Sequence, residues 1–159
     1  MITVIVVGRT RPPLDEAVRE YETRAARYWK LAIEEVDAGI GRGGRAAKEE
    51  VRAAEAERIR GRIPEGADLW LLTREGRSMS SPELARKLAD RQLHGGRPLA
   101  LCVGGAFGFS EKLREQAHRT ISLSAMTLPH EMARLILAEQ LYRAGTILRG
   151  EPYHKGGKG

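Results

Sequence analysis

The sequence contains almost no cysteine, no long apolar run and no export signal. Cys102 is the one cysteine among 159 residues, so the chain cannot form an internal disulfide, and we expect a reduced, cytoplasmic protein. No run approaches the ~20 apolar residues that a membrane-spanning helix needs. The opening residues, Met1 to Val4, show neither the basic segment nor the cleavage site of a secretion signal. We therefore expect no membrane partner.

Most motifs of nucleotide, hydrolytic and metal chemistry are also missing. The loop from Gly8 to Pro12 does not have the glycine spacing of the dinucleotide fingerprint, and no P-loop lysine motif occurs. There is no Gly-x-Ser-x-Gly nucleophile elbow. His130-Glu131 begins like a zinc protease motif, but Arg134 stands where the second histidine is required, so we expect no metal. What remains is chemistry that needs neither a metal nor a protein nucleophile.

The composition describes one folded domain with an uneven positive charge. With 42% hydrophobic and 30% charged residues, the whole chain, residues 1–159, fits a single domain and excludes general disorder. Lys and Arg exceed Asp and Glu by 27 to 21, and residues 81–159 account for 12 of the basic against 7 of the acidic residues. A basic tail, 150–159, ends the chain. This pattern fits a polyanionic partner or, equally on charge alone, a solvated surface.

Apolar periodicity predicts strands that alternate with helices. Continuous apolar runs predict buried strands over residues 2–7 and 99–103. Further strands are expected over 68–73, over 31–36, where the pattern is weaker, and briefly over 120–124. Helices are expected from Pro12 to Trp29, up to Arg60, from a cap at Ser81 to Gly95, briefly after Ser110, and from Glu131 to Leu148. The glycine-rich segment 39–45 predicts a mobile basic loop. The fold class is therefore α/β, with a mainly parallel sheet covered by helices on both faces.

The last expected helix is apolar around nearly its whole circumference. Such a helix must be buried on more than one side. In a chain of this size we expect one side to pack on the sheet and another on a second copy, which gives a two-fold homodimer. Complete burial within one chain is the less favoured alternative, because terminal helices usually lie outside a sheet.

Two loops at the ends of strands are the candidates for a binding site. Val103 to Gly108 follows the most apolar strand, and its glycines allow a close approach of the backbone to a ligand. Ser122 to His130 is small and uncharged until its last residue. In open α/β sheets, ligands bind beyond the carboxyl ends of strands, and both loops leave such ends. Ordinary tight turns remain the alternative for each.

Four segments together resemble a known family. They are Gly104-Gly105 after a strand, Leu123-Ser124-Ala125-Met126-Thr127-Leu128-Pro129-His130, Glu139-Gln140-Leu141-Tyr142-Arg143-Ala144, and Pro152-Tyr153-His154. In this order, and in a chain of this length, they resemble the bacterial large-subunit (23S) rRNA pseudouridine N3-methyltransferases. These are small members of the SPOUT, or trefoil-knot, superfamily.

The resemblance implies a fold, a cofactor and a substrate. The C-terminal segment would form a trefoil knot, and the active site would lie at a homodimer interface. S-adenosylmethionine would be bound by Leu72 at the end of the third strand and by Gly104, Gly105, Ser124, Ala125, Met126, Thr127, Leu128 and Pro129. The substrate would be a pseudouridine in a stem-loop of large-subunit rRNA, on the assembled ribosome.

The chemistry of methyl transfer indicates further candidates. The sulfonium makes the methyl group electrophilic, so the protein mainly aligns donor and acceptor. N3 of pseudouridine must lose a proton, and His154 is the first candidate base and His130 the second, unless solvent takes the proton. By the resemblance, His154 lines the cofactor site of the partner, and Tyr153 beside it is a further catalytic candidate. A packing role for His130 at a helix start is slightly favoured over a catalytic one.

Basic and aromatic side chains are candidates for RNA contact. Arginine forks onto phosphate and tyrosine stacks on bases, which favours Arg9, Arg11, Arg134, Arg143, Tyr153 and Lys155. Arg143 and Glu139 are alternatively a surface ion pair, since they are four residues apart on a helix. Arg42 and Arg45 either bind phosphate or face solvent.

Two other classes of function compete with methyl transfer. A non-catalytic RNA- or ribosome-binding protein on an α/β scaffold explains the basic second half, but not the uncharged loop Ser124–Pro129. A small-molecule enzyme that uses another nucleotide would need the phosphate-binding motifs that are absent here.

Overall fold

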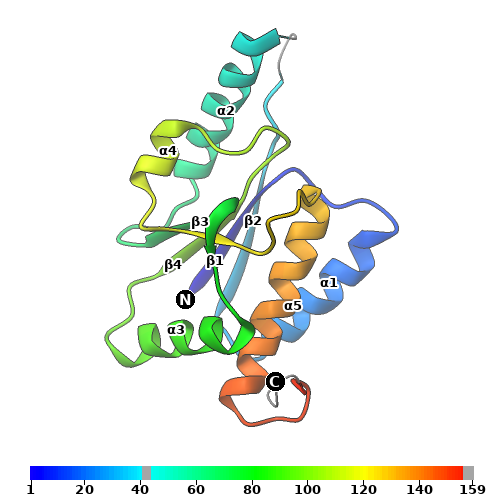
Figure 1. Ribbon diagram of the computed structural model, residues 1–159, viewed down its shortest axis with the longest axis vertical. Coiled ribbons are helices and arrows are strands. Elements are labelled where there is room, and N and C mark those ends of the chain that lie inside the picture. Colours follow the sequence, from blue (N-terminus) through cyan, green and yellow to red (C-terminus); the bar gives the residue numbers. More distant parts are fainter. Residues whose placement is uncertain (41–43, 156–159) are drawn as a thin grey trace.

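Five parallel strands form the centre of the molecule, in the order β2-β1-β4-β3-β5 (Figure 1). The computed structural model describes residues 1–40 and 44–155, with the backbone alone for residues 44–46. The strands are β1 Ile2–Val7, β2 Leu31–Val36, β3 Asp68–Ser78, β4 Leu99–Val103 and β5 Arg119–Ser122. The expected parallel α/β sheet is therefore confirmed.

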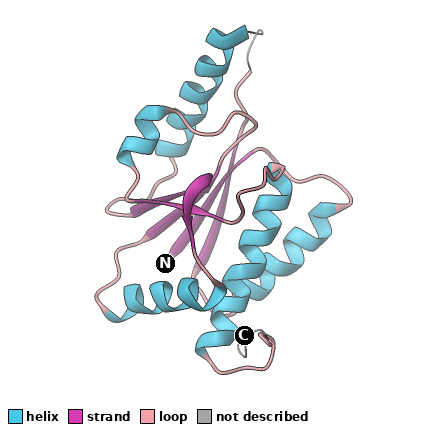
Figure 2. Cartoon of the chain, in the orientation of Figure 1, coloured by secondary structure: helices cyan, strands magenta, loops and turns pink. Residues whose placement is uncertain are grey.

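Helices cover both faces of this sheet (Figure 2). They are α1 Leu14–Ala25, α2 Gly44–Arg60, α3 Ser81–Leu93, α4 Glu111–Gln116 and α5 His130–Leu148. The apolar run of β1 is continuous because both of its faces are covered by helices. Val4 and Val6 pack in the cluster with α1, α3 and α5, whereas Ile5 and Val7 pack in the cluster with α2 and α4. Both faces of the strand are buried because side chains alternate along it.

Helix α5 packs between α1 and α3 on one face of the sheet (Figure 1). Leu137, Leu141 and Ala144 are buried there, and Trp29 Nε1 donates a hydrogen bond of 2.7 Å to the carbonyl oxygen of Leu141. Contacts with α1 and α3 of the same chain thus bury part of the surface of α5 that we expected a second copy to cover. Leu135 and Ile136 remain half-buried.

Several boundaries differ from those that the sequence predicts. Ser80, and not Ser81, caps α3, because its side chain accepts a hydrogen bond of 3.2 Å from the Glu83 amide. Strand β3 continues to Ser78, past an irregularity between Leu72 and Arg77, and pairs again with β5. Leu72 therefore lies inside β3 and not at its end. Strand β5 stops at Ser122, and α2 begins at Gly44, inside the segment expected to be a loop.

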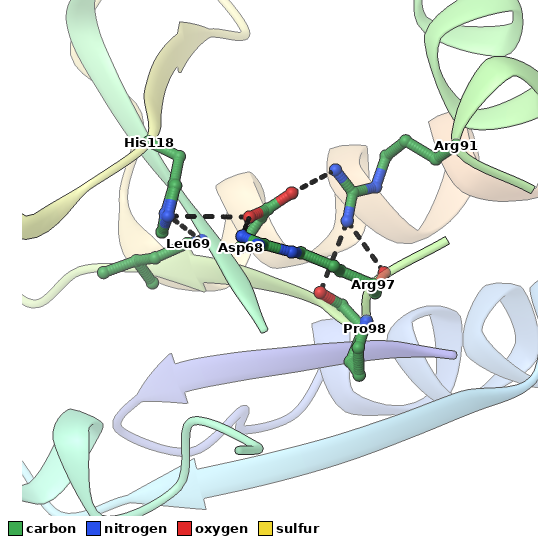
Figure 3. A network of polar contacts seen from close by, with 6 residues as sticks. All are labelled: Asp68, Leu69, Arg91, Arg97, Pro98 and His118. Carbon is green, nitrogen blue, oxygen red and sulfur yellow. Dashed lines mark hydrogen bonds and ion pairs between the residues drawn. The ribbon is translucent and has the colours of Figure 1, made fainter. Parts of the chain in front are cut away.

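A polar network surrounds Asp68 at the start of β3, at the amino ends of the strands (Figure 3). Arg91 Nη1 donates a hydrogen bond of 2.7 Å to the Asp68 carboxylate, and Arg97 lies 3.5 Å from it. The Arg91 hydrogen bond lowers the pKa of Asp68 below its usual value. His118 Nδ1 accepts a hydrogen bond of 2.9 Å from the Leu69 amide. Positive charge at this end of the sheet is therefore partly neutralised within the chain.

Candidate functional site

A hollow of about 740 Å³ opens at the carboxyl end of β4 and beside the irregular part of β3. Both loops that the sequence singled out line this strand-end hollow, together with the amino end of α5. Its walls also include residues of α2, β3 and α4. The lining residues are Lys48, Arg52, Leu72–Glu75, Val103–Phe109, Arg114, Thr127–His130 and Ala133. The volume lies within the roughly 300–1,000 Å³ of small-molecule sites.

The glycines of the hollow are required by close packing. A Cβ at Gly105 would lie 2.9 Å from a carboxylate oxygen of Glu55, and one at Gly104 would lie 3.1 Å from the Phe109 ring. A side chain at position 105 would force the buried Glu55 carboxylate to shift, and one at position 104 would press on the Phe109 ring, so the backbone itself forms this wall. Leu72 and Leu128 add apolar walls. The lining thus combines backbone groups and apolar side chains, which suits the ring and chain of a bulky organic ligand.

A smaller hollow of about 80 Å³ adjoins the first and shares Leu72 and Leu128 with it. Ser124 and Met126 line it, and the Met126 amide donates a hydrogen bond of 3.0 Å to Ser124 Oγ. Ala125 lines neither hollow and is exposed. The structure therefore gathers Leu72, the two glycines and most of the segment 124–129 at one place, which the sequence could indicate only by resemblance.

His130 begins α5 at the edge of the strand-end hollow. Its Nε2 is buried and has no hydrogen-bond partner among the described residues. A Cβ at Gly8 would lie 3.0 Å from this nitrogen, and Gly8 has a φ of +93°, which favours glycine. The end of β1 is thus shaped to receive the imidazole.

Glu55, on α2, is a functional candidate that the sequence analysis missed. It is 3% exposed, and its Oε2 accepts a hydrogen bond of 2.9 Å from the Gly39 amide. Its Oε1 has no partner in the described part of the chain. Burial raises the pKa of the carboxyl group, although the Gly39 amide, Arg58 and His130 oppose the rise. Nothing in the charged sequence around Glu55 distinguishes it from its exposed neighbours.

A second polar cluster lies between the second half of α5 and the tail that follows it. Arg143 binds the Glu139 carboxylate at 2.6 Å and lies 3.1 Å from His154 Nδ1. Tyr153 donates a hydrogen bond of 3.1 Å to Glu139, and burial, with hydrogen bonds to Tyr21 and Glu139, raises the pKa of Tyr153 to about 12. His154 Nε2 is buried without a partner in the described residues. The ion pair of Arg143 and Glu139 thus belongs to a cluster that also holds Tyr153 and His154, which we call the tail cluster.

The two clusters are far apart within one chain. His130 and Arg143 are thirteen residues apart on α5, which corresponds to roughly 20 Å along a helix. Figure 1 shows α5 running from the loop after β5 back toward the other end of the sheet. The structure does not bring Tyr153 and His154 to the strand-end hollow of their own chain.

The arginines expected to contact RNA lie in different surroundings. Arg134 is 7% exposed, and its guanidinium binds Glu22 at 2.8 Å and Glu35 at 2.6 Å, which points to a structural role instead. Arg9 and Arg11 are exposed in the loop after β1, and Lys155 is exposed in the tail. Arg42 lies outside the described residues, and for Arg45 only the backbone is described.

Neither a metal site nor a membrane span was found in the described residues. Residues 1–40 and 44–155 hold no group of three or more histidine, cysteine and carboxylate side chains placed to bind a metal ion. Within the same ranges, every helix is too short or too polar to cross a bilayer.

Comparison with known proteins gives one consistent result. A family model described as "Predicted SPOUT methyltransferase" matches residues 1–154. A protein of Gemmatimonas aurantiaca is 46% identical over 155 residues, which cover 97% of this chain and 99% of that protein. Proteins of Geotalea daltonii and Acetivibrio thermocellus are 45% and 43% identical, over 96% and 97% of this chain and 98% and 99% of their own. All three are named ribosomal RNA large subunit methyltransferase H. The chain therefore belongs to the SPOUT methyltransferase family.

Proposed function

We propose that this protein transfers a methyl group from S-adenosylmethionine to N3 of a pseudouridine in large-subunit rRNA, on the assembled ribosome in the cytoplasm. The observation that carries the proposal is the strand-end hollow, where the two candidate loops meet. The names of full-length relatives support rRNA as the substrate. A non-catalytic RNA-binding protein would not need this glycine-walled hollow.

The residues of the hollow fit S-adenosylmethionine, from which SPOUT methyltransferases generally take their methyl group. Leu72 and Leu128 offer apolar surfaces to the adenine, and the backbone at Gly104 and Gly105 lets the ligand approach closely. Ser124 to Pro129 would close the remaining side. The bound cofactor supplies an electrophilic methyl group, and the protein holds the acceptor base in line with it. A knotted path of the segment after β5 is part of this proposal.

The contact between Arg143 and His154 changes the order of the candidate bases. Because arginine can only donate, His154 Nδ1 must accept, so the neutral ring carries its proton on Nε2. His154 then acts as a hydrogen-bond donor toward the pyrimidine. The raised pKa of Tyr153 likewise keeps its hydroxyl protonated. His130 or solvent becomes the first candidate to accept the N3 proton.

A homodimer would unite the two separated clusters. One chain places its strand-end hollow and its tail cluster roughly 20 Å apart along α5, so a complete site needs a second copy. A two-fold arrangement that sets α5 against α5 brings the tail of each chain to the hollow of the other. The half-buried Leu135 and Ile136 supply apolar surface for such a contact.

Calorimetry and a methylation assay together test the proposed function. We expect saturable binding of S-adenosylmethionine to the purified protein, with ATP as the control ligand, and methyl transfer to ribosomes that lack the modification. Mass mapping of the rRNA should then place one new methyl group on a pseudouridine. Ribosome binding without saturable cofactor heat would instead establish the non-catalytic alternative.

A further inference from the structure

Four cationic side chains and one aromatic ring surround the strand-end hollow. Lys48 and Arg52 come from α2, Arg74 from β3 and Arg114 from α4, and all four line the hollow. Phe107, in the loop after β4, lines it too and is 40% exposed. We call these five residues the basic rim.

The cations of the basic rim are largely free of acidic partners. Among the described residues, Arg74 alone of the four has a carboxylate within 4.0 Å, that of the exposed Glu75 at 3.7 Å. The amino ends of the strands differ, since Asp68 binds Arg91 and Arg97 there (Figure 3). Uncompensated positive charge is thus concentrated where the hollow opens, which favours an anionic partner at that place.

The aromatic ring is held in place among these cations. Arg52 Nε donates a hydrogen bond of 2.8 Å to the Phe107 carbonyl oxygen, which joins α2 to the loop after β4. Lys48 Nζ lies 5.6 Å from the centre of the Phe107 ring. An exposed ring beside cations is the combination with which proteins bind unpaired nucleotides, by stacking on a base and by contacts to phosphates.

We propose that the basic rim is the docking surface for the RNA strand next to the methylated nucleotide, with phosphates on Lys48, Arg74 and Arg114 and an unpaired base on Phe107. This inference rests on the proposed function and adds to it the surface that holds the RNA. None of these five residues is among those that the sequence indicated for RNA contact. The rim borders the wall formed by Gly104 and Gly105, so RNA bound there enters beside the cofactor.

A pair of matched double variants tests the basic rim. Lys48→Ala/Arg74→Ala removes two rim cations and leaves Arg52, which holds the loop, in place. Arg86→Ala/Lys87→Ala removes the same charge from α3, on the other face of the sheet. Binding to unmethylated bacterial ribosomes is measured over a range of salt concentrations, and cofactor binding is measured by calorimetry.

We expect the rim variant to bind ribosomes several-fold more weakly than the wild type. Its binding should also depend less on salt: the slope of log K against log salt should be less steep by about 1.5, since each phosphate contact contributes ~0.7–0.9. Phe107→Ala should weaken ribosome binding without changing the salt slope. Because these residues of the basic rim line the strand-end hollow, ribosome binding is compared at saturating S-adenosylmethionine, so that a loss of RNA contact is separated from a loss of cofactor binding. Equal binding by the rim and α3 variants would overturn the inference and leave the proposed function intact. Weaker binding with an unchanged slope would point to a ribosomal protein and also overturn it. A wild-type protein that neither binds nor methylates ribosomes would refute the proposed function itself.

Discussion

Glu55 lies where three strand-end loops meet. Its carboxylate binds the Gly39 amide after β2, borders Gly105 after β4, and lies near His130, whose ring sits against Gly8 after β1. A side chain at position 105 would collide with it, so Glu55 and Gly105 depend on each other. One buried carboxyl group thus positions the floor of the hollow without lining it.

The raised pKa of Glu55 predicts a dependence of stability on pH. The folded protein keeps the Glu55 proton at pH values where the unfolded chain, with a glutamate pKa of about 4.3, has lost it. The contribution of this group to stability is therefore complete below about pH 4.3 and declines as pH rises toward the folded pKa. Glu55→Gln mimics the protonated acid and removes this decline.

Thermal unfolding of the wild type and Glu55→Gln is compared at about pH 5 and about pH 7.5. The midpoint of the variant should rise relative to the wild type at the higher pH. Glu50→Gln, an exposed change on the same helix, serves as the control. A difference that does not change with pH would contradict a proton held at Glu55.

At the scale of elements, Arg134 joins α5 to α1 and β2. Its guanidinium makes three hydrogen bonds, at 2.8 and 3.1 Å to Glu22 and at 2.6 Å to Glu35. Glu22 lies on α1 and Glu35 on β2, so one side chain fixes the start of the last helix against two others. By holding the start of α5 against helix α1 and strand β2, this contact also fixes the position of His130 and of the loop before it.

Arg134→Ala should therefore destabilise the fold. Removing one partner of a buried ion pair leaves uncompensated charge and costs about 3 kcal/mol. Urea unfolding measures the loss, and Arg62→Ala is the control, because its exposed pair with Glu34 should contribute under about 1 kcal/mol. Unchanged stability with a loss of RNA binding would restore Arg134 to the RNA surface.

Local sequence patterns predict the helices and strands of this fold better than the contacts between them. The strands 2–7 and 99–103 have the predicted bounds, because continuous apolar runs reflect burial on both faces. The strand 31–36 also has the predicted bounds, although it contains two glutamates. The extension of β3 past Thr73 was missed, since residues 74–78 contain no apolar run and Arg77 and Ser78 pair only with a strand more than forty residues later. The partners of Arg134 are 112 and 99 residues away, which no local pattern reveals.

The candidate site follows the same rule. The two loops could be chosen from the sequence because glycines and small side chains after buried strands have a local signature. Glu55 and the basic rim could not be chosen from the sequence, because their roles depend on residues that the fold brings beside them from distant parts of the chain. The resemblance indicated the cofactor segment, but only the structure showed that this segment lies far from Tyr153 and His154 of the same chain.

At the scale of the whole molecule, a shared site predicts complementation between two inactive variants. Gly105→Leu should block the hollow, and His154→Ala should remove the tail donor. Refolded together, about half of the dimers are mixed, and each mixed dimer contains one intact site, so we expect roughly a quarter of the wild-type methyl transfer.

Light scattering of the wild type and both variants provides the control, with twice the mass of the 17.6 kDa chain expected in each case. A single-chain mass at micromolar concentration would reject the dimer. Dimers of the expected mass without recovered activity in the mixture would show that each chain completes its own site.

The strand order also constrains how the protein is made. Strand β1 pairs with β2 early, but its other edge pairs Ile2 with Leu99, about 97 residues later in translation. At ~5–20 residues per second, a nascent chain keeps that edge open for roughly 5–20 s. During this interval β1 exposes unpaired backbone groups, which is the condition that invites aggregation. Strand β1, an inner strand of the finished sheet, is thus a part of the nascent chain that a chaperone would protect.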